Sequence, residues 1–131
     1  MNKKLLDNLK GYGPVVVRIA LSLVFFWFAI NQLIAPASWT VYLPKFLYTA
    51  GNPVIFIYAN AIFELIFATL LILGVFTRLS ALLLGLHLIG ISIVLGYNEI
   101  AVRDCGLALA TLSIVLTGPD KWCFDRKIWK K

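Results

Sequence analysis

Four long apolar runs dominate the chain, and short polar segments separate them. The runs cover residues 14–35, 53–74, 78–97 and about 101–117. Each is close to the roughly 20 residues that a helix needs to cross the hydrocarbon core of a bilayer. Runs of this length are longer than ordinary strands, and they favour helices. We therefore expect an all-α protein, an integral membrane four-helix bundle that forms a single domain over residues 1–131.

A shorter segment with a different pattern joins the first two runs. Within residues 36–52, large apolar side chains recur at helical spacing, namely Trp39, Tyr42, Leu43, Phe46 and Leu47. Pro44 interrupts this pattern, because proline cannot continue the hydrogen-bond ladder of a helix. We expect a short, broken interfacial helix between spans 1 and 2.

Composition excludes a soluble enzyme and a nucleic-acid-binding module. Hydrophobic residues make up 61% of the chain and charged residues 14%, whereas soluble domains are nearer one half and one quarter. The net charge of +6 could indicate nucleic acid, but that function needs a basic face on a soluble module. Here the basic residues flank the apolar runs, so we expect the partner to be the lipid bilayer and not nucleic acid.

The distribution of positive charge predicts the orientation of the bundle. Nine Lys and Arg residues lie on the side that holds both ends of the chain and the connection between spans 2 and 3, and two lie on the opposite side. The nine are Lys3, Lys4, Lys10, Arg78, Lys121, Arg126, Lys127, Lys130 and Lys131. Positive charge collects on the cytoplasmic side of membrane proteins. We expect both termini to be cytoplasmic, in a bacterial or archaeal cytoplasmic membrane.

A few polar residues lie inside the spans, where each is a functional hypothesis because its burial is costly. Glu64 and His87 lie near mid-bilayer, on spans that run in opposite directions. Arg103 and Asp104 lie at the start of the fourth span. Helical spacing places Asn60 on the face of Glu64, and Gln32 on a stripe with Arg18, Ser22, Phe25 and Ala29. The candidate ligand-binding or buried polar cluster is Glu64, His87, Arg103, Asp104, Asn60 and Gln32.

These residues allow more than one interpretation. Glu64 either pairs with Arg103, or hydrogen-bonds to His87, Asn60 or Gln32, or handles a proton or a ligand. We expect Arg103 to point inward with Gly106 and Ala110. We expect Arg18, near the end of its span, to extend to the cytoplasmic surface as an anchor.

The third span has two distinct faces. Its small residues, Ala81, Gly85, Ser92 and Gly96, lie on one face and His87 lies almost opposite. One face should meet the bundle and the other should be free for lipid or a second protein. Cys105 is expected to be a small packing residue.

The inventory of metal-binding residues is small. His87 is the only histidine and Met1 the only methionine, so two haem axial ligands of the usual kinds are lacking. Two cysteines do not make a zinc or iron–sulfur site. We expect no metal site and no cofactor held by protein ligands, so that any redox centre comes from a partner or a diffusing quinone.

Three blocks of sequence resemble the DoxX/DoxD family of small four-helix membrane proteins. RIALSLVFFWFAINQLIAP (residues 18–36) is similar to the first helix of the family, and FELIFATLLILGVFTRLSALLLGLHLI (63–89) to its Glu-bearing second helix, Gly-x-x-x-Arg turn and third helix. RDCGLALATLSIVLTGPDKWCFD (103–125) is similar to its Arg-Asp-x-Gly-Leu fourth helix and final Asp. The resemblance points to Glu64, to Arg78 as the structural turn, and to Arg103 with Asp104.

The resemblance implies a membrane subunit or partner of a redox system, because members of the family are associated with thiosulfate:quinone oxidoreduction. The first hypothesis is that the bundle binds a small apolar molecule, with quinone as the candidate. The alternative is a non-catalytic interaction or assembly subunit of a larger complex, with other membrane or redox proteins or further copies as partners. A proton-coupled transporter is less favoured, because no inverted repeat or broken span is visible.

Overall fold

The structure, a computed structural model, describes residues 2–129, and in that part of the chain it contains helices and no strands. Four helices are long and apolar enough to cross a membrane: α2 (Gly13–Ile34), α5 (Pro53–Leu73), α6 (Thr77–Leu95) and α7 (Glu99–Thr117). The predicted all-α membrane fold with four spans is therefore confirmed. The observed bounds depart from the predicted ones by two residues or fewer.

Shorter helices join and flank the spans. They are α1 (Lys3–Lys10), α3 (Pro36–Trp39), the 3₁₀ turn η1 (Thr40–Tyr42), α4 (Lys45–Ala50) and α8 (Phe124–Ile128). The predicted interfacial helix is thus three short pieces. The break falls at Leu43 and Pro44, both extended, because proline disfavours helical geometry in the residue before it.

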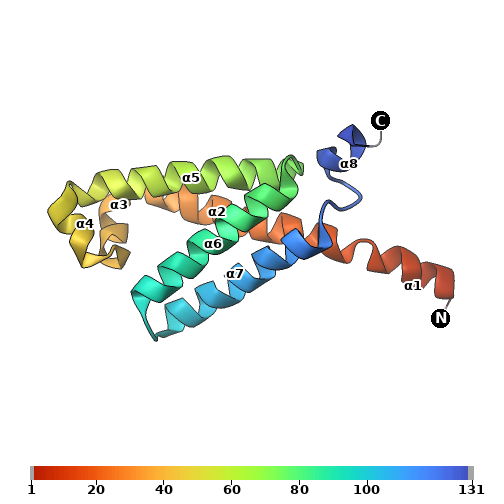
Figure 1. Ribbon diagram of the computed structural model, residues 1–131, viewed down its shortest axis with the longest axis horizontal. Helices are drawn as coiled ribbons and strands as arrows, with labels where there is room; N and C mark the ends of the chain where they lie inside the picture. Colours follow the sequence, from red (N-terminus) through yellow and green to blue (C-terminus); the bar gives the residue numbers. More distant parts are fainter. Residues whose placement is uncertain (1, 130–131) are drawn as a thin grey trace.

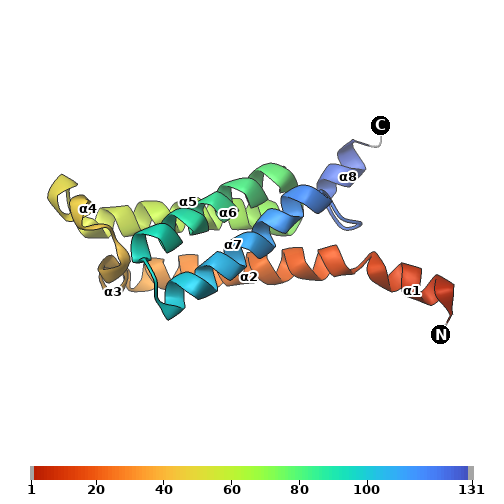
Figure 2. The same ribbon diagram turned by 60° about the horizontal axis from the view of Figure 1, so that its bottom comes forward.

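Both described ends of the chain lie at one end of the bundle, together with the α5–α6 turn (Figures 1 and 2). We call this the terminal end. The opposite end, which we call the far end, holds the α3–α4 segment and the α6–α7 turn. α2 packs along α5 and α6 along α7. Lys130 and Lys131, two of the nine charges used to predict orientation, lie outside the described residues.

Two of the predicted buried stripes hold the bundle together. On α2 the stripe of Arg18, Ser22, Phe25, Ala29 and Gln32 is buried as expected. On α5, Glu64, Ala68 and Leu71 are buried and Asn60 is partly buried.

The buried face of α7 differs from the predicted one. It consists of Ala101, Asp104, Ala108, Thr111 and Ile114, whereas Arg103 and Gly106 are exposed. The small buried residues of α7 are thus Ala101 and Ala108, and the carbonyl oxygen of Ala108 lies 3.4 Å from a Cβ added at Gly85 of α6.

The small-residue face of α6 meets α7 within the same chain. A Cβ atom added at Gly85 would lie 2.7 Å from Cδ2 of Leu112. His87, on the other face, is also largely covered, with 25% of its side chain exposed. The expectation that one of these two faces is free for lipid or a partner is therefore wrong at these positions.

The C-terminal segment folds back over the α5–α6 turn. The carboxylate of Asp125 accepts hydrogen bonds from the backbone N–H groups of Phe76 (2.8 Å) and Thr77 (2.7 Å) at the start of α6. The N–H of Asp125 donates to the carbonyl of Gly74 at 2.9 Å. This segment supplies the partners that the first turn of a helix lacks within itself, and so fixes α6 beside α5.

Gly74 is required at this contact for two reasons. Its φ of +72° lies in the left-handed region, and an added Cβ would lie 2.5 Å from Cα of Cys123. We expect Gly74→Ala to lower the free energy of unfolding by about 1–3 kcal/mol, as is typical for a residue forced into such a conformation. Gly106→Ala is the matched control, because a Cβ there meets no atom within 4 Å. Unfolding with sodium dodecyl sulfate measures both, and equal stability of the two variants would contradict this role.

Candidate functional site

Three side chains from α2 and α5 form a buried hydrogen-bonded cluster. Gln32 Nε2 donates to Glu64 Oε2 at 3.0 Å, and Asn60 Nδ2 donates to Glu64 Oε1 at 3.2 Å and to Gln32 Oε1 at 2.7 Å. Glu64 is 3% exposed. One turn of α5 separates Asn60 from Glu64, so both project from one helix face. The two amides hold the carboxylate in one position while leaving it room to accept another hydrogen bond.

His87 of α6 approaches the same carboxylate from the other side. Its Nε2 atom is 3.5 Å from Glu64 Oε1, and its ring packs on Phe63 with the centroids 4.9 Å apart. Nε2 is buried but has no hydrogen-bond partner among the described residues. Its one polar contact is thus the long one to Glu64, and a buried polar atom without a hydrogen bond is costly.

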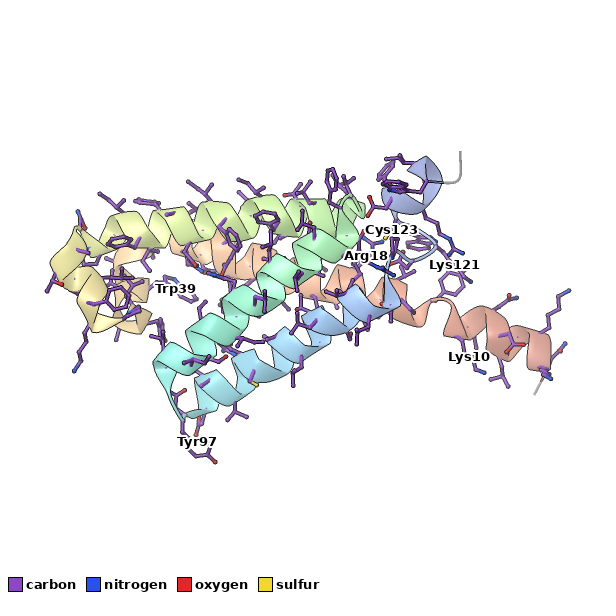
Figure 3. The ribbon with its side chains drawn as sticks, viewed as in Figure 1. Lys10, Arg18, Trp39, Tyr97, Lys121 and Cys123 are labelled. Carbon is purple, nitrogen blue, oxygen red and sulfur yellow. The ribbon has the colours of Figure 1, made fainter. Side chains whose placement is uncertain are left out.

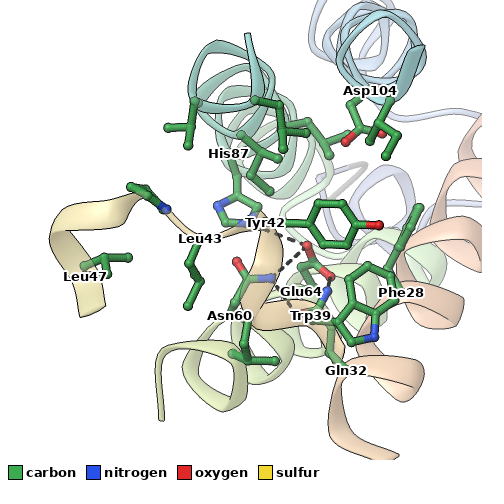
Figure 4. A pocket seen from close by; sticks show the side chains of 18 of the residues that line it. Phe28, Gln32, Trp39, Tyr42, Leu43, Leu47, Asn60, Glu64, His87 and Asp104 are labelled. Carbon is green, nitrogen blue, oxygen red and sulfur yellow. Dashed lines mark hydrogen bonds and ion pairs between the residues drawn. The ribbon is translucent and has the colours of Figure 1, made fainter. Parts of the chain in front are cut away.

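The cluster lies in the wall of a cavity of about 800 Å³ (Figure 4). Gln32, Asn60, Glu64 and His87 line one part of it, and most of the remaining lining is apolar. A volume of this size holds a small organic molecule, and a few polar groups in an apolar wall are typical of such sites.

Aromatic side chains from α2 and from the α3–η1 segment continue the wall. Phe28 and Trp39 have ring centroids 5.8 Å apart, as do Trp39 and Tyr42, and all three line the cavity. In Figure 4 Trp39 and Tyr42 lie beside Glu64. A row of aromatic faces and edges favours a flat, ring-shaped ligand, because such rings stack well.

Arg103 and Asp104 reach the cavity wall but do not join the Glu64 cluster. Arg103 Nη2 is 2.9 Å from Asp104 Oδ1, and its guanidinium lies 5.4 Å from the centroid of Phe28. The Arg103 side chain is 52% exposed. The pairing of Glu64 with Arg103 is therefore wrong, because Arg103 is satisfied by its neighbour and Glu64 by two amides.

A second buried cluster, at the terminal end, contains Arg18 (Figure 3). Arg18 Nε is 2.6 Å from Asp120 Oδ2, and Nη1 donates to the carbonyl of Leu71 at 2.9 Å. Arg18 is 2% exposed, so its predicted role as a surface anchor is wrong. It crosses the bundle from α2 to the end of α5 and to the segment after α7, and it ties these three together.

Asp120 makes the stability of the terminal end dependent on pH. Burial raises the pKa of Asp120, but the hydrogen bonds from Arg18 and from the Trp122 backbone N–H and the charge of Arg18 outweigh it, so the pKa lies below the ordinary 3.8. An acid with a lowered pKa in the folded state stabilises the fold above its unfolded pKa. We expect this contribution to be complete above about pH 4, and to be lost as the pH falls further through the folded pKa.

This pH dependence can be measured directly. Unfolding should become easier on acidification below about pH 4 in the native chain, and the slope should flatten in the Asp120→Asn variant. An unchanged slope in that variant would assign the acid sensitivity to other carboxylates.

Sequence reasoning missed several residues of both sites. Asp120 and Asp125 lie after the last span, and the sequence marked them only through the resemblance of residues 103–125 to the end of the family's fourth helix. The one further clue was Arg18, because an arginine inside a span needs an acidic partner. Trp39 and Tyr42 were predicted to lie along the interface, whereas they also wall the cavity.

Arg78 and Cys105 lie outside the cavity. Arg78 lies in the first turn of α6, consistent with its expected structural role, and its Nη2 lies 2.7 Å from the position of a Cβ added at Gly118. Cys105 is exposed and not packed. In residues 2–129 no group of three or more His, Cys, Asp or Glu side chains lies together in a way that could hold a metal ion.

Comparison with known proteins gives one match. The family model described as DoxX matches residues 13–97, which include α2, α5 and α6 and with them Gln32, Asn60, Glu64 and His87. No curated protein matches the chain. No solved structure matches it either.

Proposed function

Because the chain belongs to the DoxX family, and because its spans enclose a cavity, we propose that it binds a small ring-shaped apolar molecule between its helices and serves a redox system as a membrane subunit or partner. Quinone is the candidate ligand. The observation that carries the proposal is the largely apolar cavity of about 800 Å³ with Glu64 and His87 in its wall.

The residues present fit a quinone head group. A quinone carries carbonyl oxygens on a flat ring, and when bound it accepts electrons together with protons. An N–H of His87 can donate to such an oxygen, and Glu64 can accept from a ring hydroxyl. The aromatic row of Phe28, Trp39 and Tyr42 offers faces and edges for the ring. Glu64 and His87 can also give or take a proton beside the ring, as can Asp104 elsewhere in the cavity wall.

The assembly alternative has less support in the structure. It was motivated by the small-residue face of α6 and by the aromatic connection between spans 1 and 2. On that face Gly85 lies against Leu112 of the same chain, whereas a Cβ added at Gly96 would meet no atom within 4 Å. A role beside other redox proteins is also proposed, because the electrons that a bound quinone would take up have to come from a reductant, and residues 2–129 hold no group of three or more His, Cys, Asp or Glu side chains that could bind a redox metal to supply them. We therefore propose other redox proteins or further copies of the chain as partners, without naming the surface of the bundle that they would contact.

Tryptophan fluorescence tests whether and where the ligand binds. Trp39 lines the cavity, whereas Trp122 lies in the C-terminal segment outside it. Decylbenzoquinone, a short-tailed quinone, should quench the purified protein in lipid nanodiscs with a saturable dependence on concentration. Trp39→Phe should remove much of the saturable quenching and Trp122→Phe should not. Quenching that never saturates, or that is lost only with Trp122, would refute binding at this cavity.

We also propose that both termini are cytoplasmic, in the cytoplasmic membrane of a bacterium or archaeon. The support is the excess of positive charge at the terminal end. We expect green fluorescent protein fused to the C-terminus to fluoresce in Escherichia coli, and alkaline phosphatase fused there to be inactive. The reverse pattern would invert the bundle and place the cavity near the cytoplasm.

A further inference from the structure

We infer that the ligand reaches the cavity sideways, from the hydrocarbon core of the bilayer, through a gap beside Gly90 of α6. The ligand is then an amphiphile, with a ring at Glu64 and His87 and an apolar tail that lies in this gap. The inference rests on the proposed function and adds the route and the tail to it.

The cavity is covered toward the far end. The segment that includes α3, η1 and α4 lies there (Figure 1), and six of its residues line the cavity, namely Ser38, Trp39, Tyr42, Leu43, Pro44 and Leu47. This apolar and aromatic cover lies between the cavity and the water on that side. A molecule entering from water would have to displace it.

The wall formed by α6 is open instead. Leu86, Gly90 and Val94 line the cavity, and Leu86 and Val94 are 52% and 49% exposed. A Cβ added at Gly90 would meet no atom within 4 Å. These residues lie one turn apart on one helix face, so the cavity and the outer surface of the bundle meet along a strip without a large side chain at its centre.

The depth of this strip places it against lipid tails. Gly90 lies five residues before the end of α6 at Leu95, or about 7–8 Å along the helix axis at 1.5 Å per residue. Leu86 lies a further turn inward. A helix that spans the roughly 30 Å hydrocarbon core therefore holds both within it.

The part of the cavity wall that α2 and α7 form is less suited to an apolar tail. It includes Trp27 and the ion pair of Arg103 with Asp104. Charged groups there favour water or lipid head groups, whereas the Gly90 strip is apolar throughout. The chemistry of the two sides therefore selects the α6 side for the tail.

Closing the gap tests this route. Gly90→Leu should place a side chain in the gap without a clash, and Gly106→Leu on α7 is the matched control because a Cβ there also meets nothing within 4 Å and Gly106 does not line the cavity. Both changes raise helix propensity, so neither should unfold the protein. Stopped-flow quenching of the nanodisc-bound protein by decylbenzoquinone gives the association rate.

We expect Gly90→Leu to slow association by about tenfold or more, within the range over which such rates vary, and Gly106→Leu to match the native chain. Leu86→Ala, which widens the gap, should speed association. Equal rates in Gly90→Leu and Gly106→Leu, or a faster association confined to a Trp27→Ala variant, would overturn the route. Absence of saturable quenching in the native chain would instead refute the proposed function, so the two failures are distinguishable.

Discussion

Replacing Arg18 with Met is expected to lower the free energy of unfolding by about 3–5 kcal/mol, the cost of removing one member of a buried ion pair. The substitution leaves the carboxylate of Asp120 buried without its partner. It also removes the donor to the carbonyl of Leu71. Reversible unfolding by sodium dodecyl sulfate in mixed micelles measures the loss.

Two comparisons separate the effect of breaking the ion pair from the effect of losing an arginine in general. Arg126→Met changes an exposed residue of α8 and should cost little. In the double variant with Asp120→Asn the loss should be smaller than the sum of the two single losses, because the second change removes the stranded charge. Additive effects, each below about 1 kcal/mol, would show that Arg18 acts as the surface anchor predicted from sequence.

Glu64→Gln is expected to weaken binding of decylbenzoquinol, the reduced form of the probe, by about tenfold or more. A hydrogen bond to a charged group is worth about 1.5–3 kcal/mol, and a tenfold change in affinity corresponds to about 1.4 kcal/mol. The amide keeps the volume of the side chain and still hydrogen-bonds to Gln32 or Asn60, so the bundle should remain folded. Equilibrium quenching of Trp39 measures the affinity.

Glu99→Gln is the matched control, because Glu99 is the other glutamate of the chain and is exposed at the start of α7. Its affinity should equal that of the native protein. If Glu64→Gln folds normally and binds the quinol as tightly as Glu99→Gln does, then Glu64 only fixes the register of α2 against α5.

The four spans could be predicted because membrane insertion imposes simple rules. A span must be long and apolar, and its backbone must be satisfied internally, so composition along the chain nearly determines the helices. Helical spacing also placed Asn60 and Glu64 on one face of the second span and Gln32 on the buried stripe of the first, but it left open whether Glu64 meets Gln32, Asn60, His87 or Arg103. His87 could be predicted as a candidate because it lies near the middle of the third span, at a depth similar to that of Glu64.

The remaining features depend on contacts that periodicity does not encode. Arg103 pairs with Asp104, its neighbour in sequence, because the packing of α6 on α7 turns Asp104 inward and leaves Arg103 outside. Arg18 finds Asp120, which is 102 positions away and beyond the last span. The cover of the cavity depends on the fold-back of the broken α3–α4 segment, whose path a helical pattern cannot give.

Photo-crosslinking tests directly whether the cavity beside Glu64 binds a ring-shaped molecule. The purified protein in nanodiscs is illuminated with an azidoquinone, and labelled peptides are mapped by mass spectrometry, with excess decylbenzoquinone as competitor. We expect competed labels on cavity residues such as Trp39, Tyr42 and Leu47. Labels confined to lipid-facing residues outside the cavity, such as Leu109 and Leu116 of α7, and insensitive to the competitor would contradict it.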